Sequence, residues 1–271
     1  RVATINFNRL ALMSSTYGAY KALLKEAVRD TVKILCAHRM FLLDEIKQGL
    51  QPFMQNGYIN IKGMFSTVGI MGIVEASTVM KSLFADVPTD IIADTLSFLN
   101  KEVYALAEEF GVPINIEQIP GESMAVKLAQ MDRLIFGDKL VPFEMYANQF
   151  IPLWEDATVW ERMDADGKYC QLLTGGGIAH IGIGERVTPQ QAYKLVEYAC
   201  QSGCEHFALN SVYAKCSEGH TNFGDHSVCP ECGAEIVEKY TRVVGFFTPV
   251  SSWNKTRREW EFPQRSFGGI E

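Results

Sequence analysis

The sequence of 271 residues lacks the features that define several other classes of protein. Its apolar stretches are too short and too interrupted to span a bilayer, and we find no secretory or transit segment. Positive charge is not in excess, because the chain has 25 Lys and Arg residues and 32 Asp and Glu residues. The resulting net charge of −7 argues against broad nucleic-acid binding. These absences predict a globular cytoplasmic protein without a membrane partner.

Cysteine is too scarce, and odd in number, for a closed disulfide framework, because the chain has only seven. Four of them stand in apolar or helical surroundings: Cys36, Cys170, Cys200 and Cys204. The other three, Cys216, Cys229 and Cys232, crowd one short polar stretch. This distribution indicates a reducing compartment and a single metal site.

The crowded stretch has the spacing of a zinc knuckle. A C-P-E-C turn at residues 229–232 places two thiolates on one face of a tetrahedron, and Cys216 supplies a third ligand. We favour His220 as the fourth ligand because it lies close to Cys216, with His226 and Cys204 as alternatives. Four protein ligands leave no open position, so the sequence predicts a structural zinc ion.

The remaining pattern alternates strands and helices, which predicts an α/β fold with mainly parallel strands. The expected strands are residues 2–7, 58–72 in part, 114–119, 147–153, 172–174, 178–184 and 205–212. The expected helices are residues 14–48, with Ser14 and Ser15 as N-caps, 89–111 with Thr89 as cap, 122–132 and 188–203. We expect two domains, an α/β region at 1–212 and an irregular zinc-binding module with a tail at 213–271.

Two glycine patterns and one histidine invite a functional interpretation. The run Thr174-Gly175-Gly176-Gly177 could direct backbone N–H groups at a phosphate, although a bulge or a crowded barrel corner explains such glycines equally well. Gly245 is a lone glycine among bulky apolar residues, for which a turn at a tight contact is the simpler explanation. We expect His180 to be a core residue, and the basic residues 255–258 to form a solvated face.

Taken in order, several blocks resemble the anaerobic (class III) ribonucleotide reductases, and the resemblance covers essentially the whole chain. The blocks are Thr4-Ile-Asn6-Phe-Asn8-Arg9, Ser66-Thr67-Val-Gly69-Ile-Met-Gly72, Pro120-Gly121-Glu122-Ser123, Leu173-Thr174-Gly175-Gly176 with His180, the zinc knuckle with Arg242-Val-Val-Gly245-Phe246, and Pro249-Val-Ser-Ser-Trp253-Asn254-Lys255.

The resemblance implies the second half of a ten-stranded α/β barrel of the glycyl-radical/ribonucleotide reductase type, with a C-terminal zinc knuckle and glycyl radical loop. We therefore expect this chain to need a missing N-terminal half of the reductase. The family's thiyl-forming cysteine precedes the block at residues 4–9, so we expect it upstream of Arg1. An ATP-binding allosteric cone precedes the barrel in many members.

The implied activity is the anaerobic reduction of ribonucleoside triphosphates to deoxyribonucleotides for DNA replication. Gly245 would carry an organic radical, buried at the barrel centre and generated by a radical-SAM activating enzyme. Asn6 matches an active-site asparagine associated with formate as reductant, with a thiol protein as the weaker option. Residues 174–177 would bind substrate. We expect a homodimer.

Two other functions stay open on the sequence. One is a different glycyl radical enzyme, such as a carbon–carbon lyase or a dehydratase. The other is a zinc-ribbon binding module, in which Arg257 and Arg258 contact nucleic acid.

Overall fold

The computed structural model describes residues 1–270, and the chain divides into two compact units. The first comprises Arg1–Ile119 and Leu172–Gly176, and the second comprises Pro120–Gln171 and the described residues from Gly177 onward. The boundary expected after residue 212 falls inside the second unit. The functional division into a half-barrel and a zinc-binding module stays a prediction.

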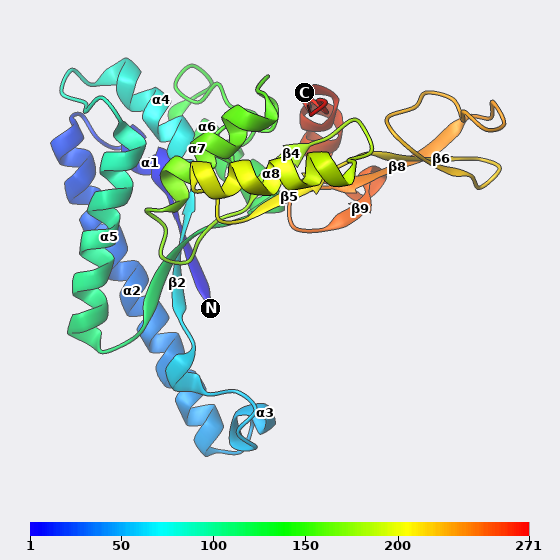
Figure 1. Ribbon diagram of the computed structural model, residues 1–271. Coiled ribbons are helices and arrows are strands. Elements are labelled where there is room, and N and C mark those ends of the chain that lie inside the picture. The colour runs from blue at the N-terminus through cyan, green and yellow to red at the C-terminus, as the bar shows by residue number, and fades with distance from the viewer. Residues whose placement is uncertain (271) are drawn as a thin grey trace. The chain divides into compact units, whose positions relative to one another are not determined.

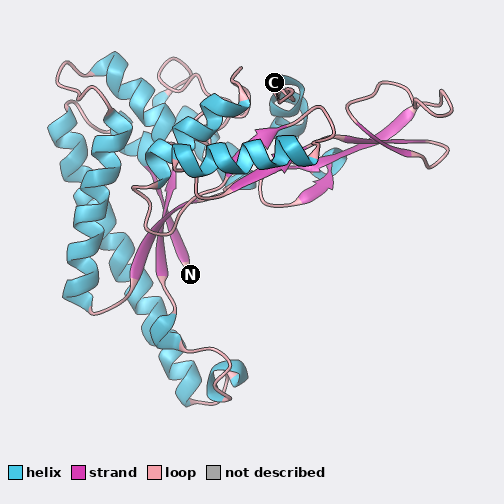
Figure 2. Cartoon of the chain, in the orientation of Figure 1, coloured by secondary structure: helices cyan, strands magenta, loops and turns pink. Residues whose placement is uncertain are grey.

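The first unit is built on a parallel sheet in the order β1-β2-β3 (Figure 2), formed by β1 (Val2–Asn6), β2 (Ser66–Met71) and β3 (Ile114–Gln118). Every residue of β2 is buried, as expected of the central strand of a covered parallel sheet. Asn6 pairs with Met71, and Ile70 pairs with Gln118, so the three carboxyl ends lie at one edge. The predicted parallel α/β pattern is confirmed here.

Two long helices, α2 (Tyr17–Lys47) and α5 (Ile91–Phe110), lie side by side (Figure 1) and pack on this sheet. Thr16 caps α2 by accepting a hydrogen bond from the backbone N–H of Ala19, and Asp90 caps α5. The expected caps at residues 14, 15 and 89 are therefore wrong by one or two positions. Three shorter helices were not predicted: α1 (Phe7–Leu12), α3 (Pro52–Gln55) and α4 (Ile73–Leu83).

The second unit contains α6 (Glu122–Phe136), α7 (Val159–Cys170), α8 (Pro189–Ser202) and the parallel pair β4 (Ala179–Gly182) and β5 (Phe207–Asn210). The helix α7 was not predicted, although Thr158 and Glu161 form a capping box at its start. The strand expected at 147–153 is wrong. The Gln149 side chain instead donates to the Ile178 carbonyl (2.9 Å) and accepts from the His180 N–H (2.8 Å), replacing strand pairing.

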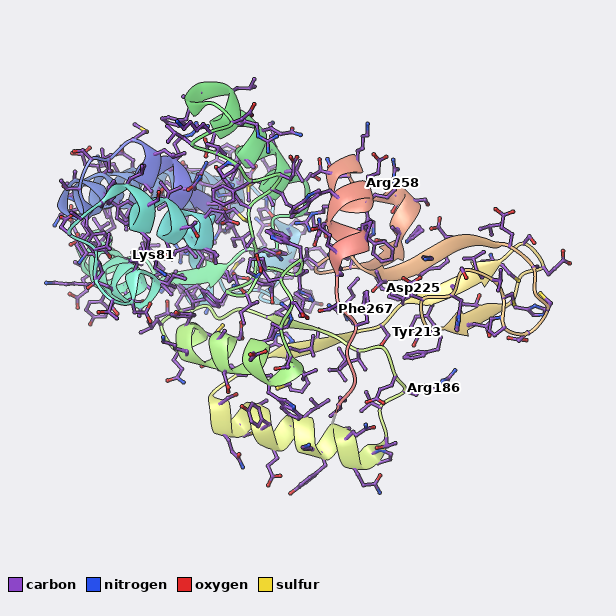
Figure 3. The ribbon with its side chains drawn as sticks, turned by 90° about the horizontal axis from the view of Figure 1, so that it is seen from above. Lys81, Arg186, Tyr213, Asp225, Arg258 and Phe267 are labelled. Carbon is purple, nitrogen blue, oxygen red and sulfur yellow. The ribbon has the colours of Figure 1, made fainter. Side chains whose placement is uncertain are left out.

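The C-terminal region, expected to be irregular, forms an antiparallel sheet in the order β7-β6-β8-β9. Its strands are β6 (Tyr213–Cys216), β7 (Thr221–Phe223), β8 (Ile236–Arg242) and β9 (Phe247–Pro249). The rings of Tyr213, carried by β6 (Figure 3), and of Phe223 and Phe247 meet edge to face across the strands, which favours pairing of such short segments.

The tail after this sheet is helical, with 3₁₀ turns η2 (Val250–Ser252) and η4 (Phe262–Gln264) and a π-helical turn η3 (Arg257–Glu261). Residues 1–270 thus hold three separate sheets. They do not by themselves show the ten-stranded barrel. No helix within these residues is long and apolar enough to cross a membrane.

Candidate functional site

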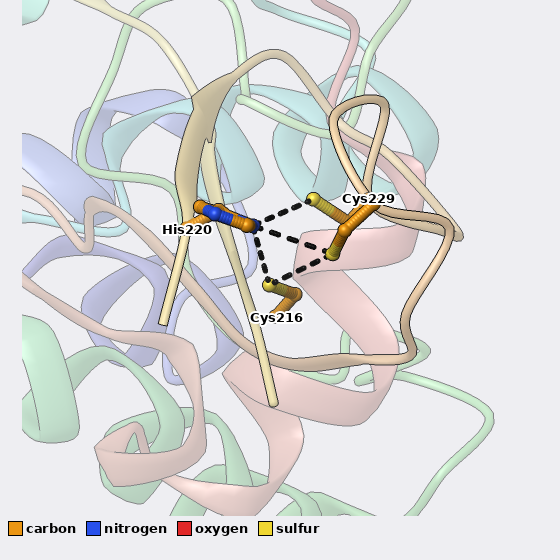
Figure 4. Close-up of side chains that lie close together, drawn as sticks. Cys216, His220 and Cys229 are labelled. Atoms are coloured by element: carbon orange, nitrogen blue, oxygen red, sulfur yellow. Dashed lines mark hydrogen bonds between the residues drawn. The ribbon is translucent and has the colours of Figure 1, made fainter. Parts of the chain in front are cut away.

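The structure brings the four predicted zinc ligands together. The ligand atoms of Cys216, His220, Cys229 and Cys232 all lie within 4.8 Å of one another. The labelled side chains of Cys216, His220 and Cys229 point toward a common centre (Figure 4). Cys216 ends β6 and His220 precedes β7, so the β6–β7 hairpin supplies two ligands, while the loop before β8 supplies the other two.

The spacing of the ligand atoms fits a tetrahedral metal ion. Zinc–sulfur bonds of about 2.3 Å place two thiolates about 3.8 Å apart on a tetrahedron. The sulfurs of Cys216 and Cys232 are 3.9 Å apart, and His220 Nδ1 lies 3.3 Å from Cys232 and 3.7 Å from Cys216. Three thiolates and one imidazole are a donor set that suits zinc.

The knuckle backbone favours a thiolate at Cys229, whereas burial and the neighbouring thiols of Cys229 and Cys216 raise the pKa of Cys232. Burial raises the pKa of Cys229, but hydrogen bonds from the backbone N–H groups of Cys232 and Glu231 outweigh it and bring the pKa to about 6. Asn222 also donates from Nδ2 to the Cys229 sulfur at 3.4 Å. Gly233, with φ of +73°, allows the tight turn that aims these groups. A thiol ionised near neutral pH is prepared to bind a metal.

Neither alternative fourth ligand lies in this cluster. The Nε2 atom of His226 is 2.8 Å from the carbonyl oxygen of Phe223 and is engaged there. Cys204 is buried in the second unit's core, where its sulfur lies 3.7 Å from Asp166 Oδ2. The geometry therefore favours His220, the fourth ligand predicted from the sequence.

Gly245 lies in the short connection between β8 and β9. The Val243 N–H donates to the Phe246 carbonyl (3.0 Å), which closes the turn. Val243 and Val244 are buried with Val250 and Trp253, whereas Gly245 and Phe246 are exposed. The expected burial of Gly245 is not met within the described chain, and its enclosure in a barrel stays a prediction.

The backbone does not require a glycine at position 245. Its φ lies outside the left-handed region, and a Cβ built there would have no heavy atom within 4 Å. The proposed tight-contact turn is therefore not the reason for this residue. A cavity of about 680 Å³ adjoins the loop and is lined in part by Arg242, Phe247 and Asn210.

Asn6 ends β1 at the carboxyl edge of the parallel sheet and caps α1. Its Oδ1 accepts a hydrogen bond from the Arg9 N–H at 3.1 Å. The carboxyl edge of a parallel sheet is where α/β proteins usually bind ligands. The catalytic role of Asn6 stays a prediction.

No strand forms at residues 172–174, where one was expected; the chain turns there, and residues 174–176 lie along β3. Thr174 Oγ1 accepts from the Ile116 N–H (3.0 Å), and the Gln118 N–H donates to the Gly176 carbonyl (3.1 Å). A Cβ at Gly175 would lie 2.9 Å from the Ile116 carbonyl oxygen. Close backbone approach thus explains Gly175 structurally, and substrate binding by Thr174, Gly175, Gly176 and Gly177 stays a prediction.

His180 is a core residue, as expected. It is 2 % exposed, and its Nδ1 pairs with Asn210 Nδ2 at 3.1 Å. Burial, helped by the nearby Arg265, lowers the His180 pKa to about 4, so its ring is neutral at pH 7. The other end of the Asn210 amide, Oδ1, is buried without a hydrogen-bond partner.

The basic residues 255–258 do not all form a solvated face. Arg257 is 1 % exposed and pairs with the fully buried Glu261, so that interpretation is wrong for Arg257, and contact of Arg257 with nucleic acid is excluded in this fold. The spacing of Arg257, Glu261 and Arg265, four residues apart among aromatic residues, was the signal that could have revealed this cluster.

The fold and the site together define a class: an α/β protein in which a Cys₃His cluster that could hold a metal lies at the start of β8 and an exposed glycine loop follows the end of β8. The family model for anaerobic ribonucleoside-triphosphate reductase matches residues 1–267. The chain therefore belongs to the anaerobic ribonucleoside-triphosphate reductase family. A comparison with curated proteins gave no match.

Solved structures support the same family. An anaerobic ribonucleotide reductase is 34% identical with a TM-score of 0.87 over 99% of this chain and 44% of its own. The enzyme from Thermotoga maritima with glycerol in the active site is 34% identical, with a TM-score of 0.83 over 97% and 44% of the two chains. The same enzyme in complex with dATP and CTP is 33% identical, with a TM-score of 0.82 over 95% and 44%. Our chain thus spans 44% of the length of these relatives.

Proposed function

We propose that this chain is the C-terminal part of an anaerobic ribonucleotide reductase and that Gly245 carries its radical. The observation that supports this role is that neither φ nor packing requires glycine at this position. The chemistry proposed for the α-carbon does require glycine. An unsubstituted α-carbon radical can flatten and delocalise between the adjacent amide nitrogen and carbonyl group. Family membership over residues 1–267 favours this function over a lyase, a dehydratase or a zinc-ribbon module.

In the proposed reaction, a radical-SAM activating enzyme removes one α-hydrogen from Gly245. The glycyl radical generates a thiyl radical on a cysteine upstream of this chain, and the thiyl removes the ribose 3′-hydrogen. The 2′-hydroxyl leaves as water. Formate then supplies two electrons and a proton and leaves as carbon dioxide, and the cysteine returns its hydrogen atom to C3′, which regenerates the thiyl radical. Such radicals last only where water and oxygen are excluded, so we expect the exposed loop to be covered in the complete enzyme.

Zinc would be held by Cys216, His220, Cys229 and Cys232 as a structural cross-link. Bound there, it ties the β6–β7 hairpin to the loop that precedes β8. Because β8 leads directly into residues 243–246, the metal would fix the start of the strand that carries the radical loop. No ligand position is left for substrate, so the chemistry stays with Gly245 and the substrate-binding residues.

Asn6 would receive formate and the ribose hydroxyls. A neutral amide both donates and accepts hydrogen bonds and does not repel an anion. The backbone of residues 174–177 would contact the substrate, which we propose is a ribonucleoside triphosphate. The relative solved with dATP and CTP supports nucleotide binding by the family. We also propose a homodimer, completed by the N-terminal half of the reductase.

The decisive experiment is anaerobic activation of the complete protein, followed by electron paramagnetic resonance. A glycyl radical retains one α-hydrogen, so the signal should be a doublet that collapses to a singlet when glycine is deuterated at the α-carbon. Gly245→Ala should remove the signal and leave the fold and the metal content intact, because the added methyl has free space. A doublet that persists in Gly245→Ala would exclude this residue as the spin carrier.

A further inference from the structure

The C-terminal tail contains three charged side chains that are removed from solvent. The side chains of Arg257, Glu261 and Arg265 are 1%, 0% and 4% exposed. Glu261 accepts from Arg257 Nη1 through one oxygen (2.6 Å) and from Arg265 Nη2 through the other (2.6 Å). The three residues follow one another at intervals of four. Arg257 and Glu261 begin and end a π-helical turn, a rare geometry often found at functional sites, and Arg265 follows the next turn.

The outer ends of this triad reach two other parts of the second unit. Arg257 Nε donates to the carbonyl oxygen of Glu122, the first residue of α6, at 2.8 Å. Arg265 donates from Nη1 to the carbonyl of Arg242 (2.7 Å) and from Nη2 to the carbonyl of Val243 (2.6 Å). These two carbonyls belong to the chain that enters the Gly245 loop. The triad therefore links the loop to a helix about 120 residues earlier in the sequence.

The segment that follows the loop also contacts this triad, through Trp253. The Arg265 guanidinium lies 4.8 Å from the centre of the Trp253 ring, and Trp253 Nε1 donates to Thr248 Oγ1 at 3.0 Å. Thr248 follows the loop on β9. Gly245 and Phe246 are exposed, so the position of the glycine depends on the residues that enter the loop, 242 and 243, and on Thr248, which follows it.

A buried ion triad adds little net stability to a fold, because the cost of removing the charges from water offsets their attraction. Replacing such a group by apolar side chains of similar size is often neutral or stabilising, whereas removing one partner is strongly destabilising. What apolar side chains cannot do is direct hydrogen bonds at two chosen carbonyl groups. The planar arginine fork does this with little freedom of movement.

We propose that Arg257, Glu261 and Arg265 form a clasp of positioning residues that holds the Gly245 loop in register through the carbonyls of Arg242 and Val243. The inference rests on the proposed function of Gly245 and goes beyond it, because it assigns the placement of the radical loop to the tail. The clasp acts on Gly245 only through the backbone of the loop.

The test separates positioning from stability in the complete protein. Arg265→Met breaks the clasp and leaves Glu261 without this partner, so it lowers stability as well. The triple variant Arg257→Met, Glu261→Leu, Arg265→Met removes all three charges together and should regain stability. Arg258→Met is the matched control, because Arg258 lies on the same helical segment (Figure 3) but bonds to Ser251 and Glu259 near the surface.

Two quantities are compared at equal fraction folded: hydrogen exchange of residues 243–249, and glycyl radical yield after activation. We expect exchange to accelerate about tenfold or more in the triple variant, as for loss of a charge-assisted hydrogen bond. Its radical yield should fall by a similar factor, while Arg258→Met matches wild type in both. A triple variant with regained stability, wild-type exchange and wild-type radical yield would overturn the clasp.

The two proposals fail differently. If wild type gives no glycyl radical, the proposed function fails and the exchange data alone decide whether the clasp holds the loop. If wild type gives the radical and Arg265→Met is too unstable to purify, the triple variant decides. Faster exchange confined to residues 243–249 supports the clasp, and unchanged or uniformly faster exchange refutes it.

Discussion

Arg242 donates a hydrogen bond from Nη1 to the carbonyl oxygen of Gly245, 3.2 Å away across the turn. This bond holds the backbone of the glycine, and the position that a Cβ would occupy has no heavy atom within 4 Å beyond the adjacent residues. The carbonyl is also one of the two groups over which a radical at this carbon would delocalise. The loop thus combines a fixed peptide group with an α-carbon that another molecule can approach.

Alanine should destabilise the protein at Gly175 but not at Gly245. At Gly175 the added methyl would lie 2.9 Å from the Ile116 carbonyl oxygen and 2.7 Å from Asn115 Nδ2, so Gly175→Ala should destabilise the protein by about 1–3 kcal/mol. Gly245→Ala should change stability by less than about 0.5 kcal/mol. Denaturant unfolding of both variants measures this. Equal destabilisation would contradict the geometry of the two sites.

Asn6→Asp should separate folding from catalysis. Aspartate caps a helix as well as asparagine does, so α1 should keep its hydrogen bond from Arg9 and stability should change by less than about 0.5 kcal/mol. The added negative charge should repel formate and raise its KM about tenfold or more. Steady-state kinetics with varied formate tests this.

Asn6→Ala is the companion variant. It should lose about 1 kcal/mol of stability with the cap. An unchanged KM for formate in Asn6→Asp would remove Asn6 from the formate site.

Loss of the metal should uncouple the radical loop from an otherwise folded protein. In the double variant Cys229→Ser, Cys232→Ser, we expect zinc content near zero, no glycyl radical, and parallel-sheet regions that retain their circular dichroism. Cys200→Ser, at an exposed cysteine outside the knuckle, is the control and should match wild type. Radical formation at the wild-type level in a metal-free double variant would show that the knuckle does not hold the loop.

Asp166 should give the protein an unusual pH dependence. Burial raises its pKa to about 6, whereas the unfolded carboxyl has its ordinary value of 3.8. Between these values the folded state binds more protons, so this group makes stability fall as pH rises from about 4 to about 6. Asp166→Asn should remove that slope and raise the free energy of unfolding at pH 7 by up to about 3 kcal/mol.

The control for this prediction is Asp164→Asn, on the same helix, where the carboxylate meets Tyr198 near the surface. Unfolding is followed by urea titration at several pH values. Asp166→Asn should differ from wild type by the slope of one proton between about pH 4 and pH 6, and identical slopes in the two proteins would contradict the assignment to Asp166. His180, whose pKa is lowered, contributes the opposite slope: stability present above about pH 6.5 that is lost on acidification toward pH 4.

The sequence by itself determined the elements that depend on local chemistry. Thr188 with Pro189 marked the start of α8, and Gly203 marked its end, because caps and left-handed glycines act within one turn. The spacing of Cys216, Cys229 and Cys232 also predicted the cluster that could hold a metal, since such a knuckle depends on positions close together in the chain.

Only the tertiary structure decided what depends on partners distant in the chain. Gln149 replaces a strand by bonding to residues 178 and 180, and the short strands β6–β9 exist because they pair with one another. Arg257 appeared to be a surface cation until Glu261 and the Glu122 carbonyl were seen to enclose it. Burial and hydrogen-bond partners are properties of the folded neighbourhood, and local sequence does not specify them.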